Sequence, residues 1–463
     1  MIARADAAGP ETLQAWDHAH LWHPFTPQAD WADATPLIVD RAEGSYLYDV
    51  EGRRFLDGVG SLWCNVHGHR HPTIDAAIIE QLGKVAHSTL LGVSHAPAIE
   101  LARRLVEITP EGLTRVFFSD DGATAVEVAL KMVFQYWRQK VDPEPNRTRF
   151  VGLTNAYHGD TLGDVSIGDV APFHAMFGPL LFPSLKAPAP YCYRCPVGLQ
   201  RESCGTACLD ELDKVLAAHP GEVAAVVIEP LVQGAAGIVV HPEGYLRGVR
   251  DLTRKHGTML IADEVAVGFG KTGAMFACDR ERVAPDVLCL SKGITGGYLP
   301  LAATLTTEAI YSAFYGRAGD GRTFHHGHTY GGNPLGAAAA LASLRVFEEE
   351  QTIENLPPKV EQLRMGLAAL AGYSHVGDVR QHGLIAGIEL VADRSTRADY
   401  PAAEAVGTKV CLRARDFGVL LRPLGNVIVI MPPLSIAAAE LDELLGAVGR
   451  SIRDVTEPEQ AAS

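Results

Sequence analysis

Short apolar runs alternate with helical stretches from about residue 114 onward, and this alternation leaves few folds open to the chain. Each run is rich in β-branched residues and ends at a turn, which is typical of a strand buried on both faces. The stretches 124–138, 209–217 and 244–256 have helical patterns between the runs. This rhythm of β–α–β units predicts an α/β fold with a mostly parallel sheet. The predicted strands are TRVFFSD, RFVGLTN, VAAVVIEP, TMLIADEV, DVLCLSK and LAATLTT.

Both ends of the chain carry other patterns. The segment 36–58 predicts a meander of short strands, followed by helices at 73–87 and 97–107. A long helical region is expected from about 333 to 371. Beyond it, further strands are expected near VRQHGLIAGIEL, VLLRP and NVIVIMPP. We therefore expect a smaller α+β unit built from both ends of the chain.

A length of 463 residues exceeds what one simple core usually organises. We expect residues 1–70 to form the N-terminal part of a small domain and 71–345 to form a large α/β domain that contains the cofactor site. Residues 346–463 are expected to form the C-terminal α+β part of the small domain.

The charge balance restricts the possible partners. A formal net charge of −15 argues against nucleic acid or an anionic membrane surface. No run of eighteen apolar residues is present, so we expect no membrane span. The first residues lack a basic patch followed by an apolar stretch, so no secretion signal is expected. Small-molecule substrates and a cytoplasmic location are the resulting expectations.

Four of the eight cysteines cluster in YCYRCPVGLQRESCGTAC, an insert at 191–208. Their spacing, C-x2-C-x8-C-x3-C, begins like a zinc knuckle, but the second pair is looser. Either a bound metal or an irregular loop with reduced thiols fits this pattern. We assign no metal ligand. The cysteines are Cys192, Cys195, Cys204 and Cys208.

Reactive side chains follow three of the predicted strands, at the edge where parallel sheets bind ligands. Lys292 follows DVLCL, Asp263 ends TMLIAD, and Glu229 ends VAAVVIE. A lysine in a desolvated position has a lowered pKa, which makes its amine a nucleophile toward an aldehyde. A buried carboxylate beside a pyridine nitrogen keeps that nitrogen protonated. Lys292 and Asp263 together therefore indicate a pyridoxal cofactor, although either residue alone would fit an ordinary surface position or helix cap.

The phosphate of such a cofactor needs a local anion site. Gly122 and Ala123 begin a predicted helix, where free N–H groups bind anions, and Thr124 adds a hydroxyl. Thr329 offers another hydroxyl in the glycine-rich segment HHGHTYGGNP. Tyr157, in AYHGD, supplies an aromatic ring that could stack on the pyridine. Each of these signals is weak alone.

Taken together, six motifs resemble the class III aminotransferases of fold type I, and the resemblance extends from about residue 20 to 453. It implies pyridoxal 5′-phosphate as cofactor, with Lys292 attached to it and Asp263 at its ring nitrogen. It also implies a homodimer whose active sites lie at the subunit interface. The motifs are SDDGATAVEVALK, AYHGD, IEPLVQGAAG, IADEVAVGFGKTG, SKGITGGYLPLAAT and HTYGGNPL.

Within the class, HLWHPFT, SLWCNVHGHRHP, KVAHSTLLG and LLRPLGNVIVIMPP are similar to one branch. That branch aminates 8-amino-7-oxononanoate to 7,8-diaminononanoate in biotin synthesis. The resemblance places Tyr157 against the cofactor ring and Gly122, Ala123, and the neighbouring subunit's His328 and Thr329 on the phosphate. It lines the substrate pocket with Phe25, Trp63, Tyr157, Gly327 and Arg422. An arginine suits the distal carboxylate of this substrate, because it binds carboxylates through two hydrogen bonds.

Two positions depart from the branch. Phe25 stands where relatives have tyrosine, and members with this phenylalanine include enzymes that use lysine as amino donor. The resemblance therefore implies either S-adenosylmethionine or lysine as donor. Ala123 stands where relatives often have serine, which leaves the phosphate to backbone N–H groups and Thr124.

Three other functions are alternatives to this one. An omega-aminotransferase acting on diamines, β-alanine or aryl amines shares the class, because fold alone does not fix the substrate. An inactive cofactor-shaped scaffold would have lost Lys292 or Asp263, and both are present. A metal enzyme centred on the cysteine cluster is disfavoured, since the cluster is distant in sequence from the strand-end residues.

Overall fold

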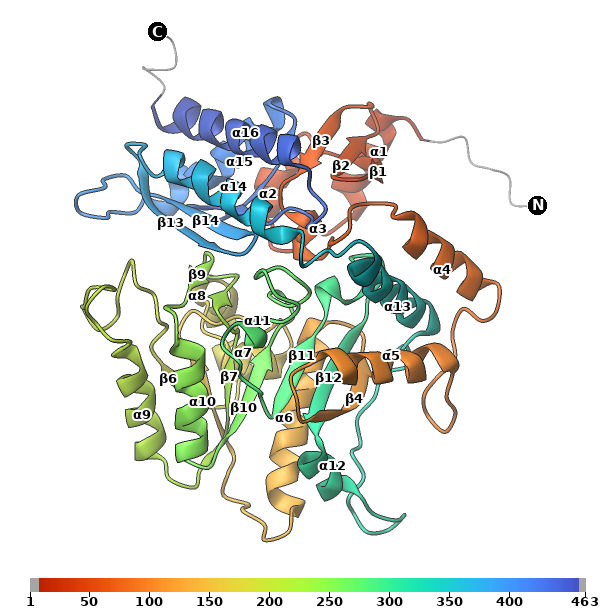
Figure 1. Ribbon diagram of the computed structural model, residues 1–463. Helices are drawn as coiled ribbons and strands as arrows, with labels where there is room; N and C mark the ends of the chain where they lie inside the picture. Colours follow the sequence, from red (N-terminus) through yellow and green to blue (C-terminus); the bar gives the residue numbers. More distant parts are fainter. Residues whose placement is uncertain (1–7, 458–463) are drawn as a thin grey trace.

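The structure is a computed structural model that describes residues 8–457. A seven-stranded sheet in the order β4-β12-β11-β10-β7-β5-β6 lies at its centre (Figure 1). β12 runs antiparallel to both of its neighbours, and all other pairs are parallel. The prediction of a mostly parallel α/β sheet is therefore confirmed. The strands are β4 (Leu113–Ser119), β5 (Arg149–Leu153), β6 (Leu185–Ala187), β7 (Val223–Ile228), β10 (Met259–Asp263), β11 (Val287–Leu290) and β12 (Ala302–Thr307).

Helices cover both faces of this sheet, which is why β7 and β10 are buried along their whole length. On β10, Ile261 packs into the core beside α6, while Leu260 and Ala262 pack into the core that includes α5, α9 and α10. Successive side chains of β10 thus pack into two apolar layers, one on each face of the sheet. The helices of this part are α4 (Pro72–Leu82), α5 (Ala96–Ile108), α6 (Gly122–Gln139), α7 (Leu162–Ile167), α8 (Ala171–His174), α9 (Cys208–Ala218), α10 (Tyr245–Lys255), α11 (Ala277–Arg280), α12 (Glu308–Phe314) and α13 (Pro334–Glu349).

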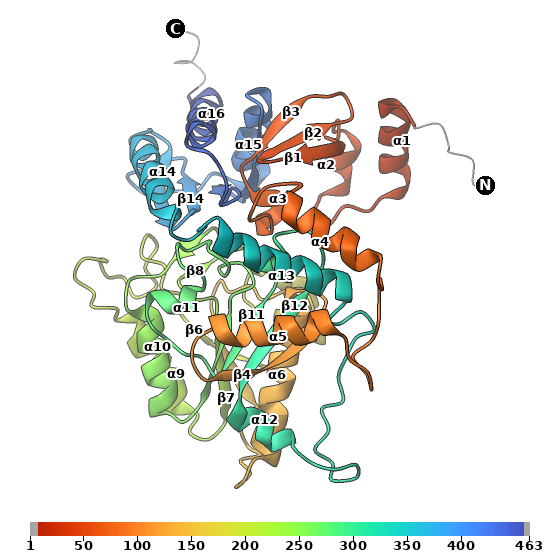
Figure 2. The ribbon, with the colours of Figure 1, turned by 45° about the vertical axis from the view of Figure 1, so that its right-hand side comes forward.

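The two ends of the chain lie together at one end of the molecule, as the red and blue ribbons show in both views (Figures 1 and 2). They share a four-stranded sheet, in which β15 runs parallel to β3 with Val419 opposite Leu56 and Leu420 opposite Asp57. The strands of this sheet are β1 (Val39–Glu43), β2 (Tyr46–Asp49), β3 (Arg54–Asp57) and β15 (Val419–Leu420).

A second four-stranded sheet follows in the order β13-β14-β17-β16, with antiparallel pairs throughout. β8 and β9 form a short separate ribbon. The strands are β8 (Val232–Gln233), β9 (Val239–Val240), β13 (Val376–His382), β14 (Ile385–Leu390), β16 (Arg422–Leu424) and β17 (Val427–Ile430). The helices beside the two small sheets are α1 (Pro10–His20), α2 (Gln28–Ala32), α3 (Gly60–Trp63), α14 (Leu356–Leu370), α15 (Val406–Asp416) and α16 (Ala438–Thr456).

Two predicted helices differ from the structure. The helix expected at 73–87 ends at Leu82, just before Gly83, a residue common at helix ends. The long helical region is divided into α13 and α14, because Gln351 has a φ of +48°, which an α-helix does not accommodate. α14 then begins with prolines in its first turn, where the missing N–H group costs nothing.

Among the helices formed by residues 8–457, none has the length and apolar character needed to cross a membrane.

Candidate active site

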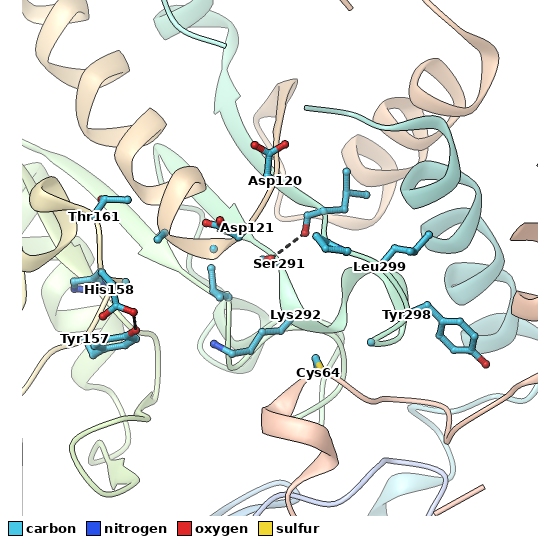
Figure 3. Close-up of a pocket in the computed structure, with 18 residues that line it drawn as sticks. Cys64, Asp120, Asp121, Tyr157, His158, Thr161, Ser291, Lys292, Tyr298 and Leu299 are labelled. Carbon is cyan, nitrogen blue, oxygen red and sulfur yellow. Dashed lines mark hydrogen bonds between the residues drawn. The ribbon is translucent and has the colours of Figure 1, made fainter. Parts of the chain in front are cut away.

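A cavity of about 720 Å³ lies at the carboxyl edge of the central sheet. Lys292 lines it, together with Tyr157 and His158 from the loop after β5 and Gly122 from the start of α6. Figure 3 shows the amine of Lys292 directed toward the side of the cavity on which Tyr157 and His158 lie. Parallel sheets bind ligands at this edge. Residues that are far apart in the sequence thus meet where the strand ends predict a site.

Lys292 follows β11 and has a φ of +40°, a conformation uncommon for a residue with a side chain. Its Nζ atom lies 5.4 Å from the centroid of the Trp63 ring. Burial lowers the pKa of the Lys292 amine, and the carboxylates of Asp263 and Glu229 oppose that shift. Desolvation thus favours the neutral, nucleophilic form of this amine.

Asp263 ends β10 and is held by two hydrogen bonds. Its Oδ1 accepts from the backbone N–H of Val265 at 3.0 Å, and its Oδ2 lies 2.7 Å from Nδ1 of His158. Both side chains are buried, and Nε2 of His158 has no partner within the described residues. Sequence reasoning missed His158, although it stands next to Tyr157 in the AYHGD motif.

Glu229 lies just after β7 and is almost fully buried. Its carboxylate accepts from the backbone N–H of Tyr157 at 3.1 Å and from that of Gly234 at 2.8 Å. Burial raises the pKa of Glu229 to about 7, with a further contribution from Asp263. Glu229 therefore fixes the start of the loop that carries Tyr157 and His158.

Tyr157 projects toward the cavity among other aromatic residues. Its hydroxyl donates to Oδ2 of Asp160 at 2.9 Å, and its ring is parallel to that of His174 at 6.1 Å between centroids. The ring of Phe173 meets it edge-on at 6.0 Å. The orientation of Tyr157 is thus fixed at both ends of its side chain.

The start of α6 forms the candidate anion site. Asp121 caps this helix by accepting from the N–H of Thr124 at 2.9 Å, and the Thr124 hydroxyl donates to the Asp121 carbonyl at 2.8 Å. The Thr124 hydroxyl is therefore already engaged in the cap. A β-carbon on Gly122 would lie 2.4 Å from Cγ1 of Val265, so glycine lets the helix start approach the segment after β10 this closely.

The segment that carries Gly327, His328 and Thr329 is exposed. None of the three lines the cavity that the described residues of this chain form. Nδ1 of His328 lies 2.7 Å from Oδ2 of Asp120, which does line it. The structure thus brings this segment close to the cavity edge but not into it.

Phe25 and Arg422 meet beside the loop of Tyr157. The Arg422 guanidinium lies 6.0 Å from the Phe25 ring centroid, and the Phe25 ring lies 5.2 Å from that of Phe173. Burial lowers the pKa of Arg422, an effect that Tyr157 opposes. Phe25 itself is 53% exposed, so this corner is open to solvent in the single chain.

Trp63 does not line the cavity found in the described part of the chain but lies beside Lys292, at the end of an unusual turn, α3. Gly60, Ser61, Leu62 and Trp63 have φ values of +54°, +47°, +66° and +71°, which makes one turn of left-handed helix. This conformation costs about 1–2 kcal/mol for each residue that has a side chain. The Trp63 ring is nevertheless buried, with Cζ3 3.0 Å from the place that a β-carbon on Gly234 would take. Backbone strain of this kind marks positions that the surrounding structure determines.

The cysteine insert lies outside this cavity. Its four thiols are free, and residues 8–457 contain no group of three or more His, Cys, Asp or Glu side chains arranged to hold a metal ion.

The family described as Aminotransferase class-III matches residues 28–452. The chain belongs to the class III aminotransferases. A curated relative from Nitratidesulfovibrio vulgaris, named adenosylmethionine-8-amino-7-oxononanoate aminotransferase, is 59% identical over 445 residues, which cover 96% of this chain and 82% of the relative.

Solved structures of aminotransferases resemble this chain along nearly its whole length. The adenosylmethionine-8-amino-7-oxononanoate aminotransferase of Methanocaldococcus jannaschii has a TM-score of 0.91 at 43% identity, covering 96% of this chain and 99% of that one. An amine transaminase from an uncultivated Pseudomonas species, solved in a PLP-bound form, has a TM-score of 0.89 at 38% identity, covering 94% and 99%. The fold-type prediction is thereby confirmed.

Proposed function

We propose that this class III aminotransferase converts 8-amino-7-oxononanoate to 7,8-diaminononanoate in biotin synthesis. The observation that carries the proposal is the near-full-length similarity to relatives named for that substrate, at 59% identity in one case and 43% in a solved structure. Lys292, Tyr157 and His158 line one cavity, and the buried carboxylate of Asp263 is hydrogen-bonded to His158. This grouping supports the reaction type.

The residues around the cavity fit pyridoxal 5′-phosphate as cofactor. They offer a desolvated amine, a carboxylate held by His158, and a helix start for a phosphate. The unpartnered Nε2 of His158 is a buried polar atom that a bound polar group would satisfy. When bound, this cofactor supplies an aldehyde that takes up an amino group and a ring that accepts electrons. Lys292 would hold the aldehyde end, and Gly122 and Ala123 the phosphate.

Lys292 then acts as the proton carrier. Its Nζ removes the proton from the donor carbon that bears the amino group. In the second half of the reaction it delivers a proton to the acceptor carbon that receives the amino group. With the cofactor bound, Asp263 would hold a proton on its ring nitrogen, and His158 keeps the Asp263 carboxylate in place through the 2.7 Å hydrogen bond. Tyr157, which lines the cavity, would pack against the cofactor ring.

The acceptor substrate has a distal carboxylate at the end of a methylene chain. We place that carboxylate at Arg422, whose guanidinium can form two hydrogen bonds to it. The methylene chain of the substrate would pass along Trp63 and Phe25. Trp63 offers apolar surface near Lys292, and Phe25 offers it near Arg422.

The amino donor is S-adenosylmethionine or lysine, and a half-reaction distinguishes them. The purified yellow holoenzyme is mixed with each compound alone, and the absorbance of the bound cofactor is followed. The true donor removes the yellow colour, and adding 8-amino-7-oxononanoate restores it with formation of the diamine. Bleaching by neither compound, or no conversion of the oxo acid, would contradict the proposal. Phe25, in the open corner beside Arg422, is the residue that we expect to influence the choice.

A second candidate function is supported by the 38% identity to an amine transaminase. An omega-aminotransferase would use diamines, β-alanine or aryl amines in the same assay. Faster turnover of those amines than of either named donor would favour it.

We also propose a homodimer in which Gly327, His328 and Thr329 complete the neighbouring subunit's site. The segment that carries them is exposed and borders the cavity through Asp120. Large apolar side chains are exposed nearby, on α4 and in the segment between α4 and α5, and Tyr330 beside Thr329 is 63% exposed. Such surfaces mark association sites.

A further inference from the structure

The left-handed turn Gly60–Trp63 is held by one buried carboxylate, that of Asp57. Oδ1 of Asp57 accepts from the backbone N–H of Ser61 at 3.0 Å, and Oδ2 accepts from the Ser61 hydroxyl at 2.8 Å. Oδ2 also lies 3.1 Å from Nε2 of His69. Asp57 is fully buried at the end of β3. These contacts join the first strained residue of the turn to the sheet that the two chain ends share.

The hydrogen bonds outweigh the cost of burying this charge. Burial raises the pKa of Asp57, but the hydrogen bonds from His69 and Ser61 lower it by more than burial raises it. The pKa of Asp57 therefore lies below its ordinary value. A carboxylate that accepts several bonds gives stronger contacts than an amide in the same place. The turn is therefore attached to a charged anchor.

The other end of the turn is attached as well. Lys271, also buried, donates from Nζ to the backbone carbonyl of Asn65 at 3.0 Å, and the backbone N–H of Asn65 donates to the carbonyl of Gly60 at 3.0 Å. Between the two anchors lie Trp63, whose ring approaches Lys292, and Cys64, which lines the cavity. Any loosening of the turn would move this wall of the cavity.

We infer that Asp57 is a positioning residue for the substrate: it holds the left-handed turn and thereby sets the place of Trp63 opposite Lys292. Asp57 does not line the cavity that residues 8–457 form, and it acts only through the turn. The inference deepens the proposed function and rests on it for the identity of the substrate that Trp63 contacts.

The test compares Asp57→Asn with the matched control Asp49→Asn in the holoenzyme. Asp49 is also buried and also anchors a turn, since it accepts from the backbone N–H of Glu51 at 3.0 Å and of Arg53 at 2.9 Å. That turn joins β2 to β3, away from the cavity. We measure kcat and KM for 8-amino-7-oxononanoate and hydrogen exchange of the peptide that spans residues 58–66.

Weakening hydrogen bonds to a charged acceptor should raise KM about 10-fold in Asp57→Asn, with kcat changed less than about 3-fold. Exchange in the 58–66 peptide should quicken about 10-fold, because the opening of the turn becomes easier. Asp49→Asn should change neither KM nor exchange in that peptide. Equal KM changes in both variants, or a looser turn with unchanged KM, would overturn the inference.

Ser61→Ala keeps the test decisive if Asp57→Asn does not fold. Ser61 is exposed, and this change removes only the hydroxyl bond to Asp57. KM should rise about 3-fold in the same direction, as expected for one lost hydrogen bond. An unchanged KM would contradict the inference.

The two proposals fail separately. A wild-type enzyme that does not aminate 8-amino-7-oxononanoate would refute the proposed substrate. Asp57 would then be judged by the exchange data and by KM for an amine acceptor that the wild type does use.

Discussion

Glu229 is the buried acid of the site that the proposed mechanism leaves without a proton-transfer role. Two backbone N–H groups bond to it, and no cationic side chain does among the described residues. Burial raises its pKa to about 7, whereas the group titrates at 4.5 when exposed. Glu229 therefore binds its proton more tightly in the folded chain than in the unfolded one.

This shift has a direction that can be measured. A group with a raised folded pKa favours folding below its unfolded pKa, and the contribution is lost as pH rises to the folded pKa. Between pH 4.5 and about 7, Glu229 should reduce the free energy of unfolding of the cofactor-free enzyme by up to about 3 kcal/mol. Urea unfolding across this range should show a smaller decrease for Glu229→Gln. Parallel pH profiles for the two proteins would contradict the assignment.

The residues of the site differ in how far the sequence could predict them. Lys292 and Asp263 were recognisable because each follows an apolar strand, and strand ends meet at one edge. The bonding of His158 to Asp263 could not be predicted, since it depends on where the loop after β5 returns. Asp57 could not be singled out from the sequence, because its role depends on the positive φ angles of Ser61, Leu62 and Trp63, which these residue types do not indicate. The assigned cofactor and substrate roles stay predictions.

At the scale of elements, α15 packs against the turn between β16 and β17 through a glycine. A β-carbon on Gly407 would lie 2.1 Å from the backbone carbonyl oxygen of Gly425. Backbone cannot rotate away as a side chain can, so the helix would have to move. β16 carries Arg422, so such a movement also reaches the proposed carboxylate site.

Gly407→Ala should therefore lower the free energy of unfolding by about 1–3 kcal/mol, the usual cost of overpacking. Gly446→Ala in α16 is the control, because a β-carbon there would meet nothing within 4 Å. That change should stabilise the protein by up to about 1 kcal/mol through helix propensity. Thermal or urea unfolding measures both. Equal free energies of unfolding for the two variants would contradict this prediction, because they would show that α15 can move away from Gly425 without a loss of stability.

The elements themselves were largely predictable from apolar periodicity, and their ends were not. All six strands predicted for the central sheet are present, because each is a buried run bounded by turns. The antiparallel direction of β12 could not be inferred, since a buried run has the same composition in either direction. The break between α13 and α14 depends on the positive φ of Gln351, a residue type with no preference for that conformation.

At the scale of the whole molecule, the proposed dimer predicts complementation between two inactive variants. Consider a mixed dimer of one Lys292→Ala chain and one chain that bears both His328→Ala and Thr329→Ala. One of its two sites contains all three substitutions, and the other site contains none. If half of the dimers are mixed after unfolding and reassembly of equal amounts, activity should return to about one quarter of wild type, as closed two-fold symmetry requires. Sites confined to single subunits would give no recovery. The division of the chain at residues 70 and 345 stays a prediction.

The pairing of β3 with β15 has a consequence for how the enzyme is made on the ribosome. Residues 54–57 leave the exit tunnel more than three hundred and fifty positions before their partner, residues 419–420. The central sheet has all its strands once residue 307 has emerged. N-terminal segments generally fold first during synthesis, and contacts between distant segments form late. The nascent chain can therefore complete its central sheet first, and the wall that holds Trp63 waits for the last part of translation.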